Sequence, residues 1–538
     1  MIKFELSDQW SDMAMSDSIF CNLIKAIKRN CETIFLCFLG TFVWGLLTHS
    51  YIFLNGSFSH DSLAAFLEDN SWKIQLGRIF VPAFRAIFRG YITLPWLIGI
   101  VSLICISLAV LFTVKILEIH SKILVFLVSG IFVTNVTVIS SVATYINSFD
   151  SDMWALVFAI ISVYLWKKYD KGFLYGSIPL CLSLGLYQAY LSVATTLIIF
   201  YLVMQLLNGE KFGIVFKKGI KSIGMILGAG ILYFISMQFI LYITQETLAS
   251  GSYNSIDTVF SMSVKNVIFT AVKGYFETIH KLLSVVSIYS EKMVFAVHVI
   301  ILAIAGLIIL FRISGKEIKV KEKILALVLI LLLPFSMNIT YVLTGGMTHD
   351  LMHYALWLSY LLVLLISWSA VDWCKSWKPV FRFGNQIISA CLVFIILWGN
   401  VQLGNAVYLR KDLEQQGTLS LFTRIVYQLE NFDGYVTGET PVVFVGKPSM
   451  VLEPIKGFER TYELVGSNNW YVLGEAANNY YQSYFDFILQ NPAVMADKET
   501  WSEMQEDSRV TAMPCYPEEG SIAILDGTIV IKLGENND

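Results

Sequence analysis

Charged residues are scarce in this sequence: Asp, Glu, Lys and Arg together make up only 15% of its 538 residues, against about 25% in typical soluble domains. This scarcity excludes an intrinsically disordered chain and a coiled coil, which both need many charged side chains. Hydrophobic residues instead make up 56%, and the mean hydropathy is +0.63. We therefore expect a protein that crosses the membrane many times rather than a soluble enzyme.

Paired cysteines and a cleavable signal sequence are also lacking. The eight cysteines form no CxxC pair and most lie in apolar runs, so neither a disulfide framework nor a zinc site is indicated. The first 30 residues contain no hydrophobic region typical of a signal peptide. We expect residues 1–30 to form a cytoplasmic N-terminus, with a short amphipathic helix over 18–29 on the membrane surface.

Long apolar runs divide residues 31–406 into membrane spans, each needing about 20 apolar residues to cross a core of about 30 Å. Residues 173–207 form one uncharged run of 35 residues; as a single helix this run would be about 52 Å long, too long for one span. We predict a break near 187–189, where two helices meet at the outer surface. With this break the sequence predicts about eleven transmembrane helices and two long outer loops, 55–90 and 245–292.

The distribution of Lys and Arg supports this count. With the N-terminus in the cytoplasm, five short loops that would face the cytoplasm carry two to five Lys or Arg each, whereas the short outer segments 148–152 and 344–351 carry none. This is the bias expected of cytoplasmic loops. The count also places the acidic tail, residues 407–538, outside the membrane.

The tail has the pattern of a small soluble α+β domain. Residues 413–429 predict a helix that leaves the last span, and 441–445 predict a short strand. Two further strands, 521–525 and 528–533, flank Asp526-Gly527, which is a strong signal for a two-residue hairpin turn. The fold class expected is thus an all-α polytopic membrane protein with a small extracytoplasmic α+β domain.

Acidic residues at the predicted outer ends of spans are the first candidate site residues. Asp61, with His60 beside it, follows the first span directly, and Asp150 and Asp152 lie in the second outer loop. A carboxylate at the edge of the bilayer is costly unless it is solvated or paired, which makes it a functional candidate. Asp152 could equally be an N-cap for the helix that follows it.

Basic residues in the first outer loop oppose the general charge bias. Arg78 and Arg85 could bind a phosphate, since the guanidinium forms a bidentate fork to phosphate oxygens; ordinary anchoring to lipid headgroups is the alternative. His349, in the outer segment 344–350, could bind a phosphate or a metal. His349 and His353, four residues apart, are weak evidence for a metal, and structural capping is favoured there.

Four motifs occur in this order: Ser59-His60-Asp61-Ser62, Gly77-Arg78, Asn147-Ser148-Phe149-Asp150-Ser151-Asp152-Met153 and Ser183-Leu184-Gly185-Leu186-Tyr187-Gln188-Ala189. Together they resemble the bacterial and phage serotype-converting glucosyl transferases of the Gtr type, integral-membrane enzymes of the GT-C class. The resemblance covers about residues 33–207 by motif and the later spans more loosely. One departure is His60, which stands where that family usually carries a second acid.

The resemblance implies transfer of a sugar, with glucose expected, from a polyprenyl-phosphate donor to a cell-envelope glycan at the outer face of the bacterial cytoplasmic membrane, with no nucleic-acid partner. Asp61 would be the general base, and inversion at the anomeric carbon is expected. Arg78, helped by Arg85, would stabilise the departing phosphate. The remaining candidates, His60, Asp150, Asp152, Tyr187, Gln188 and His349, would contact the substrates.

Metal dependence stays open, because some GT-C enzymes use Mg²⁺ or Mn²⁺ and others do not; if a divalent cation binds, Asp61, Asp150 and Asp152 are its candidate ligands. Two other functions also stay open. A flippase or exporter of lipid-linked glycans would need charges buried in the middle of its spans, often with related halves. A non-catalytic scaffold would leave the outer-loop acids dispensable.

Overall fold

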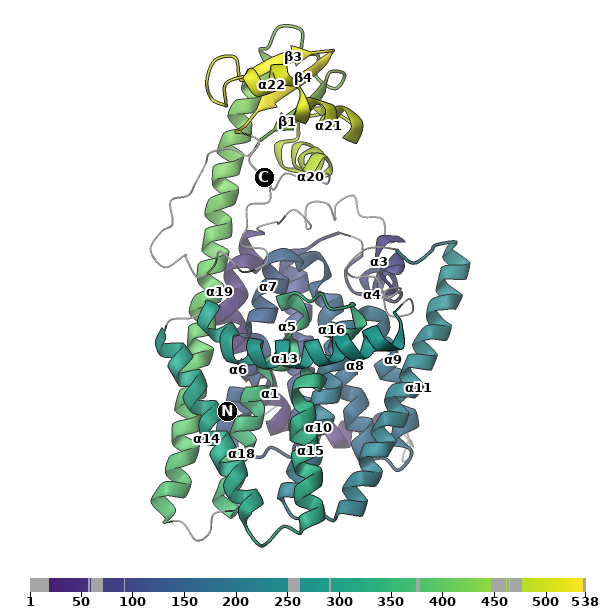
Figure 1. Cartoon of the computed structure of the whole chain (residues 1–538), viewed down its shortest axis with the longest axis vertical. Helices are drawn as coiled ribbons and strands as arrows, with labels where there is room; N and C mark the ends of the chain where they lie inside the picture. Colours follow the sequence, from purple (N-terminus) through teal and green to yellow (C-terminus); the bar gives the residue numbers. More distant parts are fainter. Residues whose placement is uncertain are drawn as a thin grey trace, which may run out of the picture.

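The structure is a helical body that carries a small mixed domain at one end (Figure 1). It is a computed structural model and describes residues 19–56, 59, 71–90, 92–249, 262–289, 292–373, 378–446, 461, 464 and 477–535. The expected fold class is confirmed: the chain is an all-α polytopic protein with a small sheet near the C-terminus. We call the end of the body below the small domain the domain end, and the opposite end the far end.

Most long helices run between the two ends, and short helices lie at the connections. The long helices of the body are α1 (Ile19–Asn55), α5 (Pro95–Ile116), α6 (Lys122–Val133), α7 (Val136–Thr144), α8 (Phe149–Lys168), α9 (Gly172–Leu186), α10 (Leu191–Leu207), α11 (Phe212–Thr244), α13 (Val264–Tyr289), α14 (Lys292–Ser314), α15 (Val320–Met337), α18 (Ser359–Trp373) and α19 (Pro379–Glu430). The short ones are α3 (Ser71–Gln75), α4 (Val81–Phe88), η2 (Ile146–Ser148), η3 (Gln188–Tyr190), α16 (Thr340–Leu343), η4 (Asp350–Met352) and α17 (Tyr354–Trp357).

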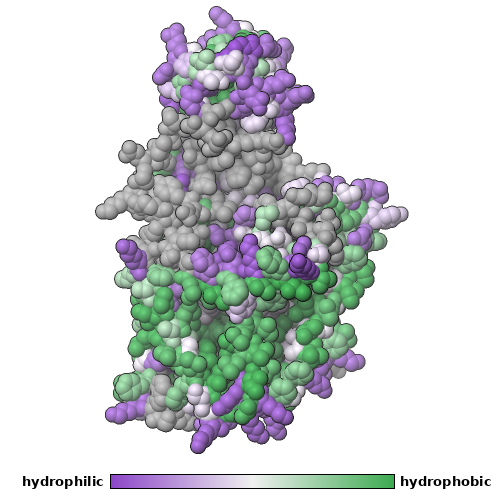
Figure 2. Space-filling view, viewed as in Figure 1, coloured by the Kyte–Doolittle hydropathy of each residue, from purple (hydrophilic) through white to green (hydrophobic). Residues whose placement is uncertain are grey.

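The surface of the body is that of a membrane protein. Figure 2 shows apolar side chains over the middle of the visible face, with polar side chains at both ends. In the described part of the chain, eight helices are long and apolar enough to cross a membrane, or nine if the bent pair α6 and α7 is one span. The predicted eleven spans additionally require α9, which has 15 residues, and α15, whose first turn is charged; that count stays a prediction.

Two breaks in the helices bring polar groups to the domain end. The bend between α6 and α7 is 40°. The Asn135 side chain stabilises it, because its Nδ2 donates to the carbonyls of Ile131 and Phe132 while its Oδ1 accepts from Val138 N. The second break separates α9 from α10 at Tyr187, whose backbone is extended. This is where the sequence predicted the uncharged run to divide.

Helix α13 lies across the other helices near the domain end, as Figure 1 shows, and packs against α14, α15 and α16. Its exposed apolar residues recur with helical spacing, at Val264, Ile268, Val272 and Phe276. An amphipathic helix of this kind is suited to the membrane interface. The sequence predicted only a long loop over residues 245–292.

Helix α19 connects the body to the small domain without a break. Its 52 residues correspond to about 78 Å, far more than a bilayer core. The predicted tail helix over 413–429 is therefore the continuation of the last span. Likewise, α1 is continuous from Ile19, so the predicted helix over 18–29 is joined to the first span; its position on a cytoplasmic surface stays a prediction.

The small domain contains a four-stranded sheet in the order β2 (Val494–Met495), β1 (Pro441–Val445), β4 (Thr528–Lys532) and β3 (Ile522–Leu525). Strands β3 and β4 form the predicted hairpin, in which Asp526 and Gly527 both have positive φ angles, as its two-residue turn requires. β1 pairs in parallel with both β4 and β2. The domain's helices are α20 (Ala477–Tyr484), a π-helix (Phe485–Leu489), α21 (Lys498–Glu506) and α22 (Ser508–Ala512).

Candidate active site at the domain end

The structure brings together candidate residues from three separate segments at the domain end. These segments are the connection from α3 to α4, the start of α8, and the break between α9 and α10. Asp61 and His60 lie outside the described residues, so their predicted roles stay predictions. The other seven candidates are described.

The segment that carries Arg78 is fixed to the break between α9 and α10. Phe80 N donates to the Gly185 carbonyl over 2.9 Å. A Cβ atom at residue 185 would lie 2.3 Å from the Phe80 ring, so only glycine permits this close approach. Tyr233 of α11 donates its hydroxyl hydrogen to the Gly77 carbonyl over 2.8 Å. Arg78 is therefore presented from a backbone that is held on both sides.

Gln188 belongs to the same support. Its Nε2 donates to the Leu76 carbonyl over 3.3 Å and to the Tyr233 hydroxyl oxygen over 3.1 Å. These contacts show how Gln188 positions the Arg78 segment. Its predicted contact with a sugar stays a prediction.

Arg78 itself is half-buried and stacks on an aromatic ring. Its guanidinium carbon lies 4.3 Å from the centroid of the Tyr187 ring, within the range of a cation–π contact. The guanidinium makes no hydrogen bond or ion pair with another described residue. Its nitrogen atoms are thus available to an anion that enters from the domain end.

Arg85 and Arg89 are used differently, because they hold the loop that begins α8. Arg89 Nε pairs with Asp150 Oδ2 at 2.8 Å, and both side chains are at most 4% exposed. Arg89 also donates to the carbonyls of Asn147 and Ile92, and Arg85 donates to the Asn147 carbonyl and to Ser148 Oγ. We call Arg85, Arg89, Asn147, Ser148 and Asp150 the Arg89 cluster. Its contacts favour a structural role for Arg85 and Asp150 over direct substrate binding.

Asp152, two residues beyond Asp150 in α8, has different surroundings. Its side chain is buried, yet it forms no hydrogen bond or ion pair with another described residue. Burial disfavours its charged form most strongly; the fields of Arg78, Lys73 and Arg85 favour that form, and Asp150 opposes it. Asp152 is not the N-cap, because α8 begins at Phe149 after Ser148. A buried carboxylate in this state is a strong candidate for substrate contact.

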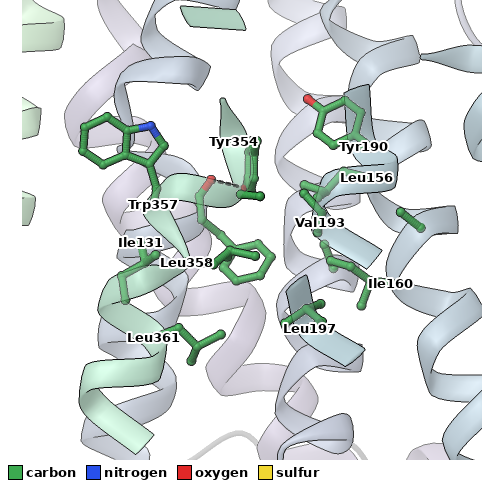
Figure 3. Packing of buried hydrophobic residues seen from close by; sticks show 14 of the residues in the cluster. Ile131, Leu156, Ile160, Tyr190, Val193, Leu197, Tyr354, Trp357, Leu358 and Leu361 are labelled. Atoms are coloured by element: carbon green, nitrogen blue, oxygen red, sulfur yellow. Dashed lines mark hydrogen bonds between the residues drawn. The ribbon is translucent and has the colours of Figure 1, made fainter. Parts of the chain in front are cut away.

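The tyrosines Tyr187, Tyr190 and Tyr354 form a row beside Asp152. The ring centroids of Tyr187 and Tyr190 are 5.7 Å apart, and those of Tyr190 and Tyr354 are 5.6 Å apart. Tyr190 also lies within the electrostatic range of Asp152. Figure 3 shows Tyr190 and Tyr354 above a layer of packed side chains that includes Val193 and Leu358. We call Asp152, Arg78, Tyr187 and Tyr190 the Asp152 cluster; it has an apolar floor.

The connection between α16 and α18 carries a second polar group, next to Tyr354 in the sequence. His353 Nε2 lies 3.2 Å from Lys281 Nζ of α13 and 3.0 Å from Thr348 Oγ1, and its Nδ1 lies 3.9 Å from an Asp350 oxygen. Burial lowers the pKa of both His353 and Lys281, although Asp350 acts in the opposite direction on each. The predicted residue in this segment, His349, is exposed and gives η4 no side-chain cap.

Sequence reasoning did not single out Lys73, Arg89, Tyr190 or Lys281 as functional residues. The only available signal for Lys281 was a basic residue in an amphipathic stretch of a long outer loop. Its partner His353 is 72 residues away, which no local pattern reveals. Among the residues that the structure describes, no group of three or more His, Cys, Asp and Glu is placed to hold a metal ion, so the question of a cation stays open.

Taken together, the fold and these clusters define an integral-membrane protein with a charged site at one end of its spans. In the described body, buried Asp, Glu, Lys and Arg side chains lie near helix ends or, in α19, beyond the apolar part of the helix. This placement disfavours a transport pathway lined by buried charges.

The family follows from residues 50–366, more than half of the chain, which match the glucosyl transferase GtrII family. The chain belongs to that family, and the resemblance seen in the motifs is confirmed. It is therefore a membrane glucosyltransferase of the kind that modifies cell-envelope glycans. The search of curated proteins and that of solved structures give no match.

Proposed function

We propose that the protein transfers glucose from a polyprenyl-phosphate donor to a cell-envelope glycan, in a site formed at the domain end by the Asp152 cluster, with Asp61 as its general base. The observation that carries this proposal is Asp152 itself, a buried carboxylate without a hydrogen-bond partner among the described residues, in the field of Arg78 and Lys73. A sugar phosphate offers the two complementary groups, hydroxyls for the carboxylate and an anion for the arginine.

The proposed reaction is a single displacement. The acceptor hydroxyl oxygen attacks the anomeric carbon, and the bond from that carbon to the phosphate oxygen breaks with its electron pair left on the phosphate. Asp61 accepts the hydroxyl proton as general base, and Arg78 stabilises the charge that develops on the phosphate. Asp152 orients the sugar hydroxyls or binds a divalent cation. Attack from the face opposite the leaving group inverts the anomeric configuration.

The proposed location is the bacterial cytoplasmic membrane, with the N-terminus in the cytoplasm and the small domain outside. The loops at the far end support this orientation, since they carry many Lys and Arg residues, such as Lys167 and Arg312. The acceptor glycan would then reach the site from the same side as the small domain.

The test supplies membranes that contain the protein with radiolabelled polyprenyl-phosphate glucose and the envelope glycan. We expect label transfer by the wild type and a rate at least about 100-fold lower for Asp61→Asn, the loss typical of a missing general base. Asp372→Asn, at the far end of α18, is the control and should match the wild type. Absence of transfer from every polyprenyl-phosphate sugar contradicts the function; undiminished transfer by Asp61→Asn contradicts only the role of the base.

A further inference from the structure

An apolar crevice opens between α10, α11 and α15. Its volume is about 420 Å³, and its walls include Leu202 of α10, Gly219 and Ile223 of α11, and Leu329 of α15. Ile223 is 54% exposed, so the crevice opens on the apolar surface of the body. A water-soluble ligand has no route to it from that side, whereas a lipid chain does.

The few polar side chains in the walls present no polar group to a ligand. Ser222 Oγ donates to the Gly219 carbonyl over 2.7 Å, and Ser336 Oγ donates to the Leu333 carbonyl over 2.9 Å. Thr195 Oγ1 is shared among three backbone carbonyls, including that of Ser336. Because these hydroxyls are satisfied by the helices themselves, the crevice suits a ligand made only of hydrocarbon.

The crevice lies along α10 and α11, two helices that also contribute to the candidate active site. Its wall reaches Thr195 of α10 and Ile226 of α11. Tyr190, in the Asp152 cluster, is five residues before Thr195, and Tyr233, which supports Gly77, is seven residues beyond Ile226. At 1.5 Å per residue the axial separations are about 8 and 10 Å. A lipid whose phosphate lies at Arg78 would therefore have its chain beside the crevice.

We infer that this crevice binds the isoprenoid chain of the lipid-linked sugar donor; this rests on the proposed function. An ordinary phospholipid is the competing occupant. A phospholipid also carries a phosphate that could contact Arg78, but it has no sugar for the Asp152 cluster. The donor is held at both ends, by its phosphate and by its chain.

Gly219 allows a direct test because a side chain there enters the crevice. A Cβ at this position would have only Leu202 Cδ1 within 4 Å, at 3.8 Å, and at Gly230 of the same helix it would have no neighbour within 4 Å. Gly219→Phe should therefore fill the crevice, and Gly230→Phe, which does not line it, is the matched control. Both variants put the same residue into one exposed helix.

Steady-state transfer is measured with two donors, a long-chain polyprenyl-phosphate glucose and citronellyl-phosphate glucose. In Gly219→Phe we expect KM for the long-chain donor to rise about tenfold, the loss expected when a few methylene groups lose their burial. KM for the short-chain donor, kcat for both donors and all constants of Gly230→Phe should stay unchanged. An equal change for both donors, or no change for either, overturns the inference.

A binding measurement separates this inference from the proposed function. A long-chain polyprenyl phosphate with a diazirine in its chain is photolysed with the wild type, and the labelled residues are mapped. Labelling of α10, α11 and α15 that polyprenyl phosphate displaces and phosphatidylglycerol does not supports the inference. Labelling displaced equally by both lipids, or confined to other helices, overturns it. Failure of sugar transfer by the wild type would instead count against the proposed function.

Discussion

Two acidic residues on the first turn of α8, Asp150 and Asp152, are both buried, yet their surroundings differ in kind. Asp150 is paired with Arg89 and accepts from Ser151 N, so its charge is satisfied by the protein. Asp152 lies near positive charges, but its side chain forms no hydrogen bond with any other described residue. This difference separates a carboxylate that stabilises the protein from one that we propose contacts the substrate. Burial alone does not distinguish them.

The largest expected effect follows from breaking the Arg89 cluster. Arg89→Gln leaves Asp150 buried without its ion pair, which typically costs about 3–5 kcal/mol. We expect a clear fall in the apparent Tm of the protein in detergent and a low yield. The measurement is a thermal melt followed by tryptophan fluorescence.

The control for this change is Lys122→Gln. Lys122 pairs with Glu32, and these side chains are 70% and 69% exposed, so the loss should be below about 1 kcal/mol. Equal Tm values for the two variants would show that the Arg89 pair does not hold the loop.

A smaller effect, on activity alone, is expected from the Asp152 cluster. Arg78→Gln removes the cation proposed to meet the donor phosphate, and kcat/KM should fall about 100-fold, as when one preorganised stabilising group is lost. Arg78→Lys keeps the positive charge but lacks the planar guanidinium, so its kcat/KM should lie between those of the wild type and Arg78→Gln. The apparent Tm should change little, because Arg78 forms no ion pair with another described residue. Full activity in Arg78→Gln would remove it from the site.

The smallest effect comes from an exposed counterpart of the Arg89 pair. Arg509 of the small domain contacts Asp507 and Asp526, and these contacts lower the pKa of both carboxyl groups below the ordinary Asp value. A lowered pKa in the folded state stabilises the protein at pH values above the unfolded pKa, about 3.9. This stabilisation disappears as the pH falls through the folded values.

Arg509→Gln should therefore lower the Tm slightly at pH 7, and the difference from the wild type should shrink steadily as the pH approaches 3. Added salt should reduce it as well, since exposed pairs are screened. Melting curves between pH 3 and 7 at two salt concentrations give the comparison. A difference that grows on acidification would mean that Arg509 acts by another route.

The sequence predicted those features that have a local signal. The break after Leu186 follows from a run too long for one span, and the hairpin follows from Asp526-Gly527. Charged pairs between distant segments have no such signal. Arg89 and Asp150 are 61 residues apart, so the sequence alone could not separate Arg85 and Arg89, which hold the loop, from Arg78. The sequence did not predict the transverse helix α13 for the same reason, since its position depends on contacts with other segments.

The most direct test of this account places Asp150→Asn and Asp152→Asn side by side and measures both sugar transfer and apparent Tm. The two residues lie on one turn, so helix position and change of charge are matched. We predict that Asp152→Asn loses transfer by about 100-fold or more with a nearly unchanged Tm, whereas Asp150→Asn chiefly loses Tm. Normal transfer by a folded Asp152→Asn protein would contradict the central claim that this carboxylate serves the substrate.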